Sequence, residues 1–138
     1  MLTQYGVVPV RRVADGGVEV LLITSRDTRR WVVPRGNPIA GASAAQSAAQ
    51  EAFEEAGILG SVTERPIGSY RYEKRRRSGV ALAAEVHLFR MTVEEERDDW
   101  PEKGQRERRW FAPSEAAAAV AEDDLAEVIR GMAAGGAD

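Results

Sequence analysis

The stretch GNPIAGASAAQSAAQEAFEEAGI, residues 36–58, places three glutamates within five positions and then closes on a glycine and an isoleucine. On a helix, Glu51, Glu54 and Glu55 stand at positions i, i+3 and i+4, so their carboxylates project from one stripe. Like charges at this spacing repel each other by about 0.2–0.5 kcal/mol per pair. Either bound cations offset this repulsion, or the stripe is a well-solvated acidic face.

The same stretch carries the signals of a helix with defined ends. Ser43 and Gln46 have the spacing of a capping box. Gly57 stands where a glycine that ends a helix is expected. On a helical wheel, the side roughly opposite the three glutamates is formed by Ala45, Ala49, Ala52, Phe53 and Ala56. We therefore expect one face to pack through small residues and the other to carry only carboxylates.

Strand and helix patterns interleave along the rest of the chain. Strands are predicted over residues 6–13, 18–24, 67–72, 80–93 and 108–111, with a short apolar run at 31–33. The turn signal Asp15-Gly16-Gly17 joins the first two strands into a hairpin. Helices are predicted over 113–120 and 123–132, loops over 25–30, 35–41 and 94–99, and a frayed tail over 133–138. Residues 1–138 contain no repeat or linker, so we expect a single domain with an α/β fold of the α+β type.

Composition excludes several classes of protein. The chain has no cysteine, which rules out a disulfide scaffold and a cysteine-ligated zinc or redox site. It has no apolar run of the ~18–20 residues that a membrane span needs, and no long apolar run near its start. A formal net charge of −3 argues against nucleic acid as a partner. We expect a cytoplasmic protein without membrane partners.

The basic residues are almost all arginine, since only Lys74 and Lys103 are lysines among 19. Arginine presents a planar fork of donors that matches phosphate and carboxylate oxygens. A genome rich in G and C would produce the same bias, so the arginines alone do not identify the partner.

Residues 36–58 resemble the Nudix box, whose pattern is G-x5-E-x7-R-E-U-x-E-E-x-G-U, where U is bulky and apolar. Gly36, Glu51, the pair Glu54-Glu55, and Gly57-Ile58 match this pattern at the right spacing. The segment WVVPRG at 31–36 also looks like the lead-in of the family. Three positions depart from the pattern, because Ala42 replaces its first glutamate, Gln50 its arginine and Ala52 its first bulky residue.

The resemblance implies an α/β/α sandwich with a mixed sheet, in which the box helix carries a Mg²⁺ site that Mn²⁺ can also fill. It assigns Glu51 and Glu55 as metal ligands, with the backbone carbonyl of Gly36 as a further ligand. Glu54 would bind through water or act as the base that deprotonates the attacking water. Gln50, one helical turn before Glu54, could brace it by a neutral hydrogen bond. The implied catalytic set is Glu51, Glu54 and Glu55.

Residues 98–120, DDWPEKGQRERRWFAPSEAAAAV, look like the corresponding part of Nudix enzymes that cleave diphosphoinositol polyphosphates and diadenosine polyphosphates. This implies a small-molecule polyphosphate substrate, cleaved at a pyrophosphate bond. Alternatives within the class are ADP-ribose, a modified nucleoside triphosphate and the 5′ end of RNA. A different class, motivated by Ala42 and Gln50, is a sensor that binds a nucleotide or polyphosphate without turnover and regulates a partner.

Several further residues are candidates for contact with the substrate. The predicted substrate-binding set is Arg26, Arg30, Arg35 and Gln50. Residues 75–77, all arginine, are read as a charged hairpin tip, with contact to a polyanion as the alternative. One of Arg106, Arg108 and Arg109 is expected to face the site. Residues 94–96, all glutamate, are read as a solvated loop, with an extra metal ligand or base as the alternative. Tyr70, Tyr72, Trp100 and His87 are expected to be structural.

Overall fold

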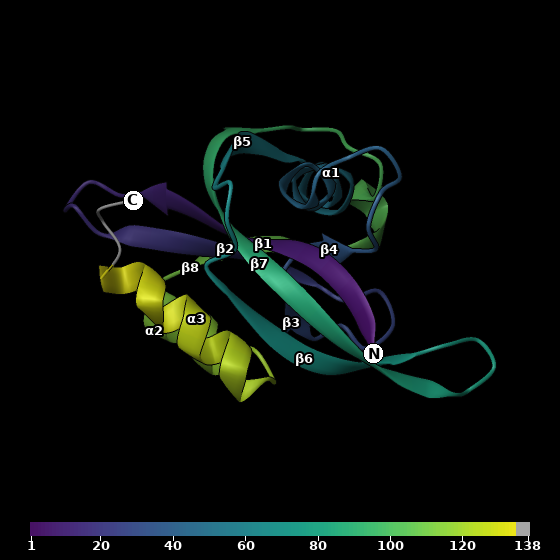
Figure 1. The fold of residues 1–138 in the computed structure, drawn as a ribbon. Coiled ribbons are helices and arrows are strands. Elements are labelled where there is room, and N and C mark those ends of the chain that lie inside the picture. Colours follow the sequence, from purple (N-terminus) through teal and green to yellow (C-terminus); the bar gives the residue numbers. More distant parts are fainter. Residues whose placement is uncertain (135–138) are drawn as a thin grey trace.

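The computed structural model describes residues 1–134 as a sheet covered by helices on both faces (Figure 1). Within these residues the strands are β1 (Leu2–Arg12), β2 (Val18–Thr24), β3 (Trp31–Val32), β4 (Arg35–Gly36), β5 (Ile58–Val62), β6 (Gly68–Arg75), β7 (Ala81–Glu96) and β8 (Arg108–Phe111). The helices are α1 (Ala44–Ala56), α2 (Pro113–Ala119) and α3 (Asp123–Ala134), with a 3₁₀ turn at Lys103–Gln105. None of the described helices has the length and apolar composition needed to cross a membrane.

The sheet is mixed, as the resemblance implied. Its central path runs β3-β2-β1-β7-β5, with β4 paired to β1, β6 to β7 and β8 to β2. The long strands β1 and β7 run parallel, with Tyr5 opposite His87, while the other pairs are antiparallel. The predicted hairpin of β1 and β2 is confirmed, with Val10 opposite Val20.

Two hydrophobic cores lie on the two faces of the sheet because strand side chains alternate in direction. On β1, Val7 packs on the side of α1, whereas Val8 and Val10 pack on the side of α2 and α3. The core under α1 is built on that helix from Ala48, Ala52 and Ala56. The other core contains Leu125 and Ile129 of α3. Figure 1 shows α1 on one side of the sheet and the α2–α3 pair on the other, which is the predicted α/β/α sandwich.

Helix α1 begins and ends where the sequence predicts. The Ser43 hydroxyl accepts a hydrogen bond from the backbone N–H of Gln46, and the Gln46 side chain accepts one from the N–H of Ser43. Gly57 adopts a left-handed conformation, with φ of 68°, and its N–H donates to the carbonyl of Phe53. The capping box and the glycine stop are therefore both confirmed.

The predicted division of α1 into two faces is wrong in part. Glu55 is buried, because it lies seven residues after Ala48 and so returns to the same side of the helix. Ala49 and Phe53 were expected in the packed face, but they line a shallow groove at the outer side of the helix. Ala52 and Ala56 are confirmed in the packed face, Ala45 is partly buried against the same core, and Ala48 joins them.

Other boundaries also differ from the prediction. The acidic run 94–96 is the end of β7, where it pairs with β5, a strand that was not predicted. Arg35 and Gly36 were expected in a loop but form the short strand β4 against Tyr5 and Gly6. Strand β6 extends through Arg75, so only the end of the charged run lies in the turn. The predicted frayed tail is wrong for residues 133 and 134, since α3 continues to Ala134; residues 135–138 lie outside the described part of the chain.

Candidate active site

Glu51 and Gly36 are brought together where α1 lies over the end of β4. A Cβ placed on Gly36 would overlap the carboxyl group of Glu51, so only a glycine leaves room for that carboxylate. The pairing of Gly36 with Tyr5 of β1 fixes this position in the sheet. Two residues that the sequence assigned to one metal site, fifteen positions apart, therefore touch.

Glu55 is the buried member of the acidic stripe, with 8% of its surface exposed. Its Oε1 accepts a hydrogen bond of 3.3 Å from the backbone N–H of Arg35, and its Oε2 lies 3.8 Å from a guanidinium nitrogen of Arg106. Burial raises the pKa of Glu55 to about 8, Arg106 opposes this rise, and the neighbouring Glu51 adds to it. Without a cation, the protonated form of this carboxyl group is therefore favoured.

The pKa of Glu51 is also shifted by burial and by the neighbouring carboxyl groups. Burial raises the pKa of Glu51, a hydrogen bond with Glu55 lowers it, and the charges of Glu54 and Glu102 raise it again. A hydrogen bond between two carboxyl groups requires a proton on one of them. We assign that proton to Glu55, because it is the more deeply buried of the two.

Glu54, whose charge also acts on Glu51, is held by Gln50. The amide Nε2 of Gln50 donates a hydrogen bond of 2.8 Å to Glu54 Oε2, which confirms the predicted neutral brace. Gln50 lines the shallow outer groove along α1 and not the large cavity described below. Its predicted contact with the substrate remains a prediction, and its described contact is with Glu54.

Arg106 is the arginine of the 106–109 segment that faces the site. Its Nε donates a hydrogen bond of 2.7 Å to Glu102, another guanidinium nitrogen approaches Glu55, and a third donates to the carbonyl of Thr24 at 3.2 Å. Only 10% of the Arg106 side chain is exposed. Sequence reasoning did not single out Glu102, although it stands four residues before Arg106, a spacing that permits an ion pair.

The residues present fit a divalent cation that prefers oxygen ligands. Glu51 and Glu55 supply two neighbouring carboxyl groups, and the backbone of Gly36 lies against the Glu51 carboxyl group closely enough to exclude a Cβ. Among residues 1–134, no three side chains of the His, Cys, Asp and Glu types converge into a ready metal cage. A cation held here would keep several water or substrate oxygens, which is the usual coordination of Mg²⁺.

A cavity of about 780 Å³ opens beside Glu55. It is lined by side chains from the loop after β2, from β6, from the segment before β8 and from the α2–α3 connection. Its cationic side chains are Arg26, Arg30, Arg35, Lys74, Arg75 and Arg106. Three of the predicted substrate-binding arginines therefore share one cavity with a predicted metal ligand. Arg75 was read as part of a charged hairpin tip, but in the structure it lines this cavity.

Arg35 is fixed against two tyrosines. It donates a hydrogen bond of 2.9 Å to the hydroxyl of Tyr70, and its guanidinium lies 3.9 Å from the centre of the Tyr72 ring. Tyr70 is fully buried, as expected of a structural residue, whereas Tyr72 lines the cavity. No carboxylate is described in an ion pair with Arg35 in residues 1–134. An anion in the cavity would supply that missing charge.

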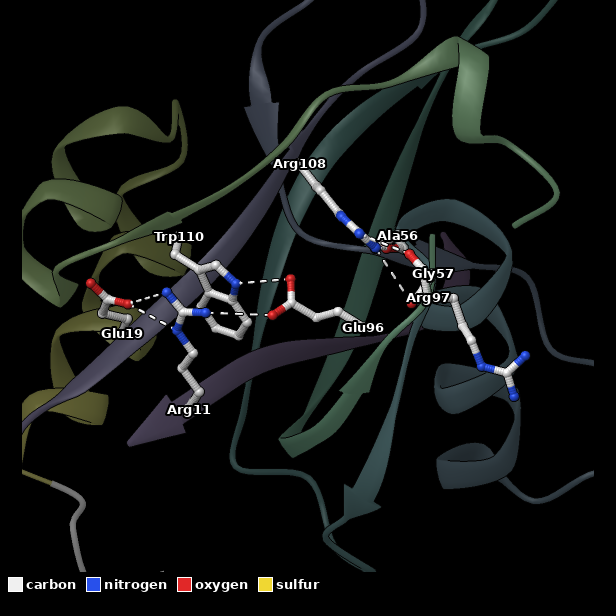
Figure 2. A network of polar contacts seen from close by, with 8 residues as sticks. All are labelled: Arg11, Glu19, Ala56, Gly57, Glu96, Arg97, Arg108 and Trp110. Atoms are coloured by element: carbon white, nitrogen blue, oxygen red, sulfur yellow. Dashed lines mark hydrogen bonds and ion pairs between the residues drawn. The ribbon is translucent and has the colours of Figure 1, made fainter. Parts of the chain in front are cut away.

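Arg108 secures the C-terminal end of α1 (Figure 2). It donates hydrogen bonds of 2.8 Å to the carbonyls of Ala56 and Arg97, and its guanidinium lies 4.0 Å from the centre of the Trp100 ring. The same ring packs against Gly57, where a Cβ would overlap it. A cation at this end of a helix also opposes the partial negative charge there. Arg108 therefore positions the helix that carries the glutamates.

The glutamates at 94–96, for which a metal ligand or base was the alternative reading, form contacts at the end of β7. Glu96 accepts hydrogen bonds from Arg11 and from the indole N–H of Trp110, and Figure 2 shows this group apart from the end of α1. Glu94 accepts from Ser61, and Glu95 pairs with Arg97. These contacts hold the end of β7.

Residues 3–132 match the NUDIX domain family. The chain is 32% identical over 102 residues to Nudix hydrolase 12, mitochondrial, of Arabidopsis thaliana, an alignment that covers 72% of this chain and 50% of that protein. It is 32% identical over 101 residues to diphosphoinositol polyphosphate phosphohydrolase 3-beta of Bos taurus, covering 71% and 57%. The chain thus spans about half the length of the curated relatives it matches.

The fold is also found in solved structures. A binary complex of the C. elegans Ap4A hydrolase superposes with a TM-score of 0.70 at 20% identity, covering 97% of this chain and 96% of that one. The E. coli dihydroneopterin triphosphate pyrophosphohydrolase gives a TM-score of 0.72 at 19% identity, covering 96% and 94%. Both likenesses cover nearly the whole chain, including the sheet and the helices on each face.

Proposed function

Because this chain belongs to the Nudix hydrolase family, we propose that it hydrolyses a pyrophosphate bond in a polyphosphorylated small molecule with the help of Mg²⁺. The observation that carries this proposal is the position of Glu55. It belongs to the acidic cluster at Gly36 and also lines the cavity that holds the six cationic side chains. A phosphate chain in that cavity would reach the metal-binding carboxylates.

Glu51, Glu55 and the carbonyl of Gly36 would hold the cation. When bound, it would supply positive charge that neutralises the phosphoryl oxygens and lowers the barrier to attack by water. Glu54 has the free carboxylate oxygen needed to take a proton from the attacking water, while Gln50 holds its other oxygen. Arg106 keeps the Glu55 carboxylate in place through an interaction at 3.8 Å.

The cationic side chains of the cavity would position the phosphates. Arg26 donates a hydrogen bond of 3.1 Å to Gln105, and Arg30 donates one of 3.3 Å to Thr28, so both are held at the cavity by exposed neutral partners. Arginine forks bind phosphate oxygens through paired hydrogen bonds. Highly phosphorylated substrates are favoured: diphosphoinositol polyphosphates or dinucleoside polyphosphates. The activities for which the similar bovine and nematode proteins are named support these two classes.

A sensor without turnover is the second candidate. Gln50 stands at a position where the family pattern has an arginine, and it braces Glu54 by a neutral hydrogen bond and not by a charge. Ala42 also replaces the first glutamate of the pattern. The glutamate and the arginine of the pattern are therefore lost together, and neither charge remains without the other. This double replacement is compatible with metal and ligand binding at a lower catalytic rate.

Turnover of the purified protein separates the two candidates. The substrates are diadenosine polyphosphates, diphosphoinositol phosphates, ADP-ribose and nucleoside triphosphates, each assayed with Mg²⁺, with Mn²⁺ and with a chelator. We expect cleavage that requires the metal, and a loss of at least ~100-fold in kcat in Glu54→Gln, as removal of a catalytic base typically produces. Glu95→Gln is the matched control, because Glu95 lies on β7 and forms its ion pair with Arg97, just after that strand.

Ligand binding without metal-dependent cleavage of any substrate would favour the sensor. Equal rates in the wild type and Glu54→Gln would show that Glu54 is not the base. A loss in Glu95→Gln comparable to that in Glu54→Gln would move the reacting groups to the end of β7.

A further inference from the structure

Glu122, in the connection between α2 and α3, has a buried carboxylate oxygen without a partner. The residue lines the large cavity, and its Oε1 is shielded from solvent yet accepts no hydrogen bond from residues 1–134. Its backbone carbonyl accepts the N–H of Ala126 at 3.0 Å, which fixes Glu122 at the first turn of α3. A buried acceptor left unsatisfied costs free energy, so such groups usually have a role.

The neighbours of Glu122 do not satisfy it. The pKa of Tyr70 is raised, chiefly by burial, while Arg35 opposes the rise and Glu122 adds to it, so the carboxylate is near the tyrosine. The Tyr70 hydroxyl nevertheless accepts its hydrogen bond from Arg35. No ion pair between Arg35 and Glu122 is described, although both line the same cavity. The cavity therefore presents a cation and a carboxylate that are not paired with each other.

Asp27 and Glu73 also line the cavity, but each stands beside cationic side chains of its own segment, whereas Glu122 in the α2–α3 connection does not. The wall formed by this connection contributes only Ala121 and Glu122, so it carries a carboxylate and a methyl group but no cation. A phosphate placed against this wall would meet like charge, at short range and partly shielded from water. A hydroxyl or amine placed there would donate to the free oxygen and offset the cost of its burial.

Building on the proposed function, we propose that Glu122 determines specificity by accepting a hydrogen bond from an unphosphorylated, donor-bearing end of the substrate. The favoured substrate has a phosphate chain at one end, for the arginines and Glu55, and a hydroxyl- or amine-bearing group at the other. A nucleoside polyphosphate meets this description. An inositol ring phosphorylated on every side does not, because one of its phosphates would face Glu122.

Two ligands and three variants separate the acceptor from its charge. Binding is measured by calorimetry, with a methylene-bridged, non-hydrolysable diadenosine tetraphosphate and with inositol hexakisphosphate. Glu122→Ala removes acceptor and charge, whereas Glu122→Gln removes the charge and keeps a carbonyl acceptor. Glu127→Gln is the control, because Glu127 is exposed on the same helix and does not line the cavity.

We expect Glu122→Ala to weaken the diadenosine analogue by about tenfold, a typical effect of losing a charge-assisted hydrogen bond. Glu122→Gln should lose less, because a neutral acceptor remains. Both variants should bind inositol hexakisphosphate several-fold more tightly than the wild type, since both remove the repelling charge. Glu127→Gln should match the wild type with both ligands.

Equal changes with the two ligands, or the same changes in Glu127→Gln, would overturn the proposal, because they would indicate a general effect of charge or stability. Failure of the wild type to bind the diadenosine analogue would also overturn it. Failure of the proposed function is a separate result: the wild type would then cleave no substrate in the turnover assay, while the opposite shifts in binding would still support the role of Glu122.

Discussion

Replacing Glu55 by glutamine should stabilise the metal-free protein at alkaline pH while abolishing its metal-dependent activity. The folded protein raises the pKa of Glu55 from 4.5 to about 8, mainly through burial. The folded state therefore holds a proton between these two values that the unfolded chain has already released. Stability is greatest at the acidic end of this range and falls as the pH rises toward 8.

The expected magnitude follows from the width of that range. Each pH unit between the two pKa values costs the folded state about 1.36 kcal/mol. Between pH 6 and pH 8 this amounts to a loss on the order of 2 kcal/mol, less where Arg106 or solvent relaxation eases the buried charge. Glu55→Gln has no ionisable group at this position, so this pH-dependent loss of stability is absent. Arg106 keeps its hydrogen bond of 2.7 Å to Glu102.

Urea unfolding at pH 6, 7 and 8 in chelator measures this pH-dependent loss directly. The free energy of unfolding of Glu55→Gln minus that of the wild type should grow with pH, by about 2 kcal/mol over the range. Saturating Mg²⁺ should flatten the pH dependence of the wild type, because a cation stabilises the ionised carboxylates. Glu127→Gln, at an exposed position of α3, should follow the wild type. A difference between Glu55→Gln and the wild type that does not change with pH would refute the assignment of the proton to Glu55.

Three further variants test the surroundings of this carboxylate. Gly36→Ala should abolish metal-dependent turnover and weaken Mg²⁺ binding measured by calorimetry, because the new Cβ would displace the carboxylate of Glu51; an active Gly36→Ala enzyme would show that this contact is dispensable. Arg108→Ala should lower the free energy of unfolding, measured in urea, by about 2 kcal/mol, because it removes two hydrogen bonds and a cation at a helix end. An unchanged free energy of unfolding would mean that water replaces these contacts. Gln50→Ala should lower kcat by several-fold with little change in KM, since it frees Glu54 to rotate; an unchanged kcat would remove Gln50 from the positioning of the base.

Spacing along the chain predicted the elements whose signals are local. The ends of α1 follow from Ser43, Gln46 and Gly57, which act on the backbone next to them. Strand β5 was missed because ILGSV is short and contains a glycine, so it is defined mainly by its pairing with β7. The sequence does not contain that partner locally, and a strand of this kind can be recognised only when its neighbour is known.

The site was predictable where it depends on spacing in α1 and not where it depends on packing. The spacing of Glu51, Glu54 and Glu55 placed them on one stripe, but the burial of Glu55 depends on how α1 lies on the sheet. Arg106 comes just before β8, where the alternation of a strand does not yet apply, so the sequence could not select it from its neighbours. Glu122 gave no signal at all, because an unpartnered carboxylate is a property of the folded cavity.

The replacement at position 50 of the box becomes intelligible once Arg106 is considered. The family pattern places an arginine at position 50, on the same helix as the glutamates, whereas this chain has a neutral Gln50 that donates a hydrogen bond to the base candidate Glu54. The positive charge beside Glu55 comes instead from Arg106, which is 10% exposed and reaches it from outside the helix. Arg106 also lines the cavity and is held by Glu102, so the cation that steadies the metal-binding carboxylate stands where the phosphates would enter. Under the proposed function, metal binding and phosphate binding would therefore share one guanidinium, and Arg106 would supply a counter-charge to the acidic cluster in place of the arginine at position 50.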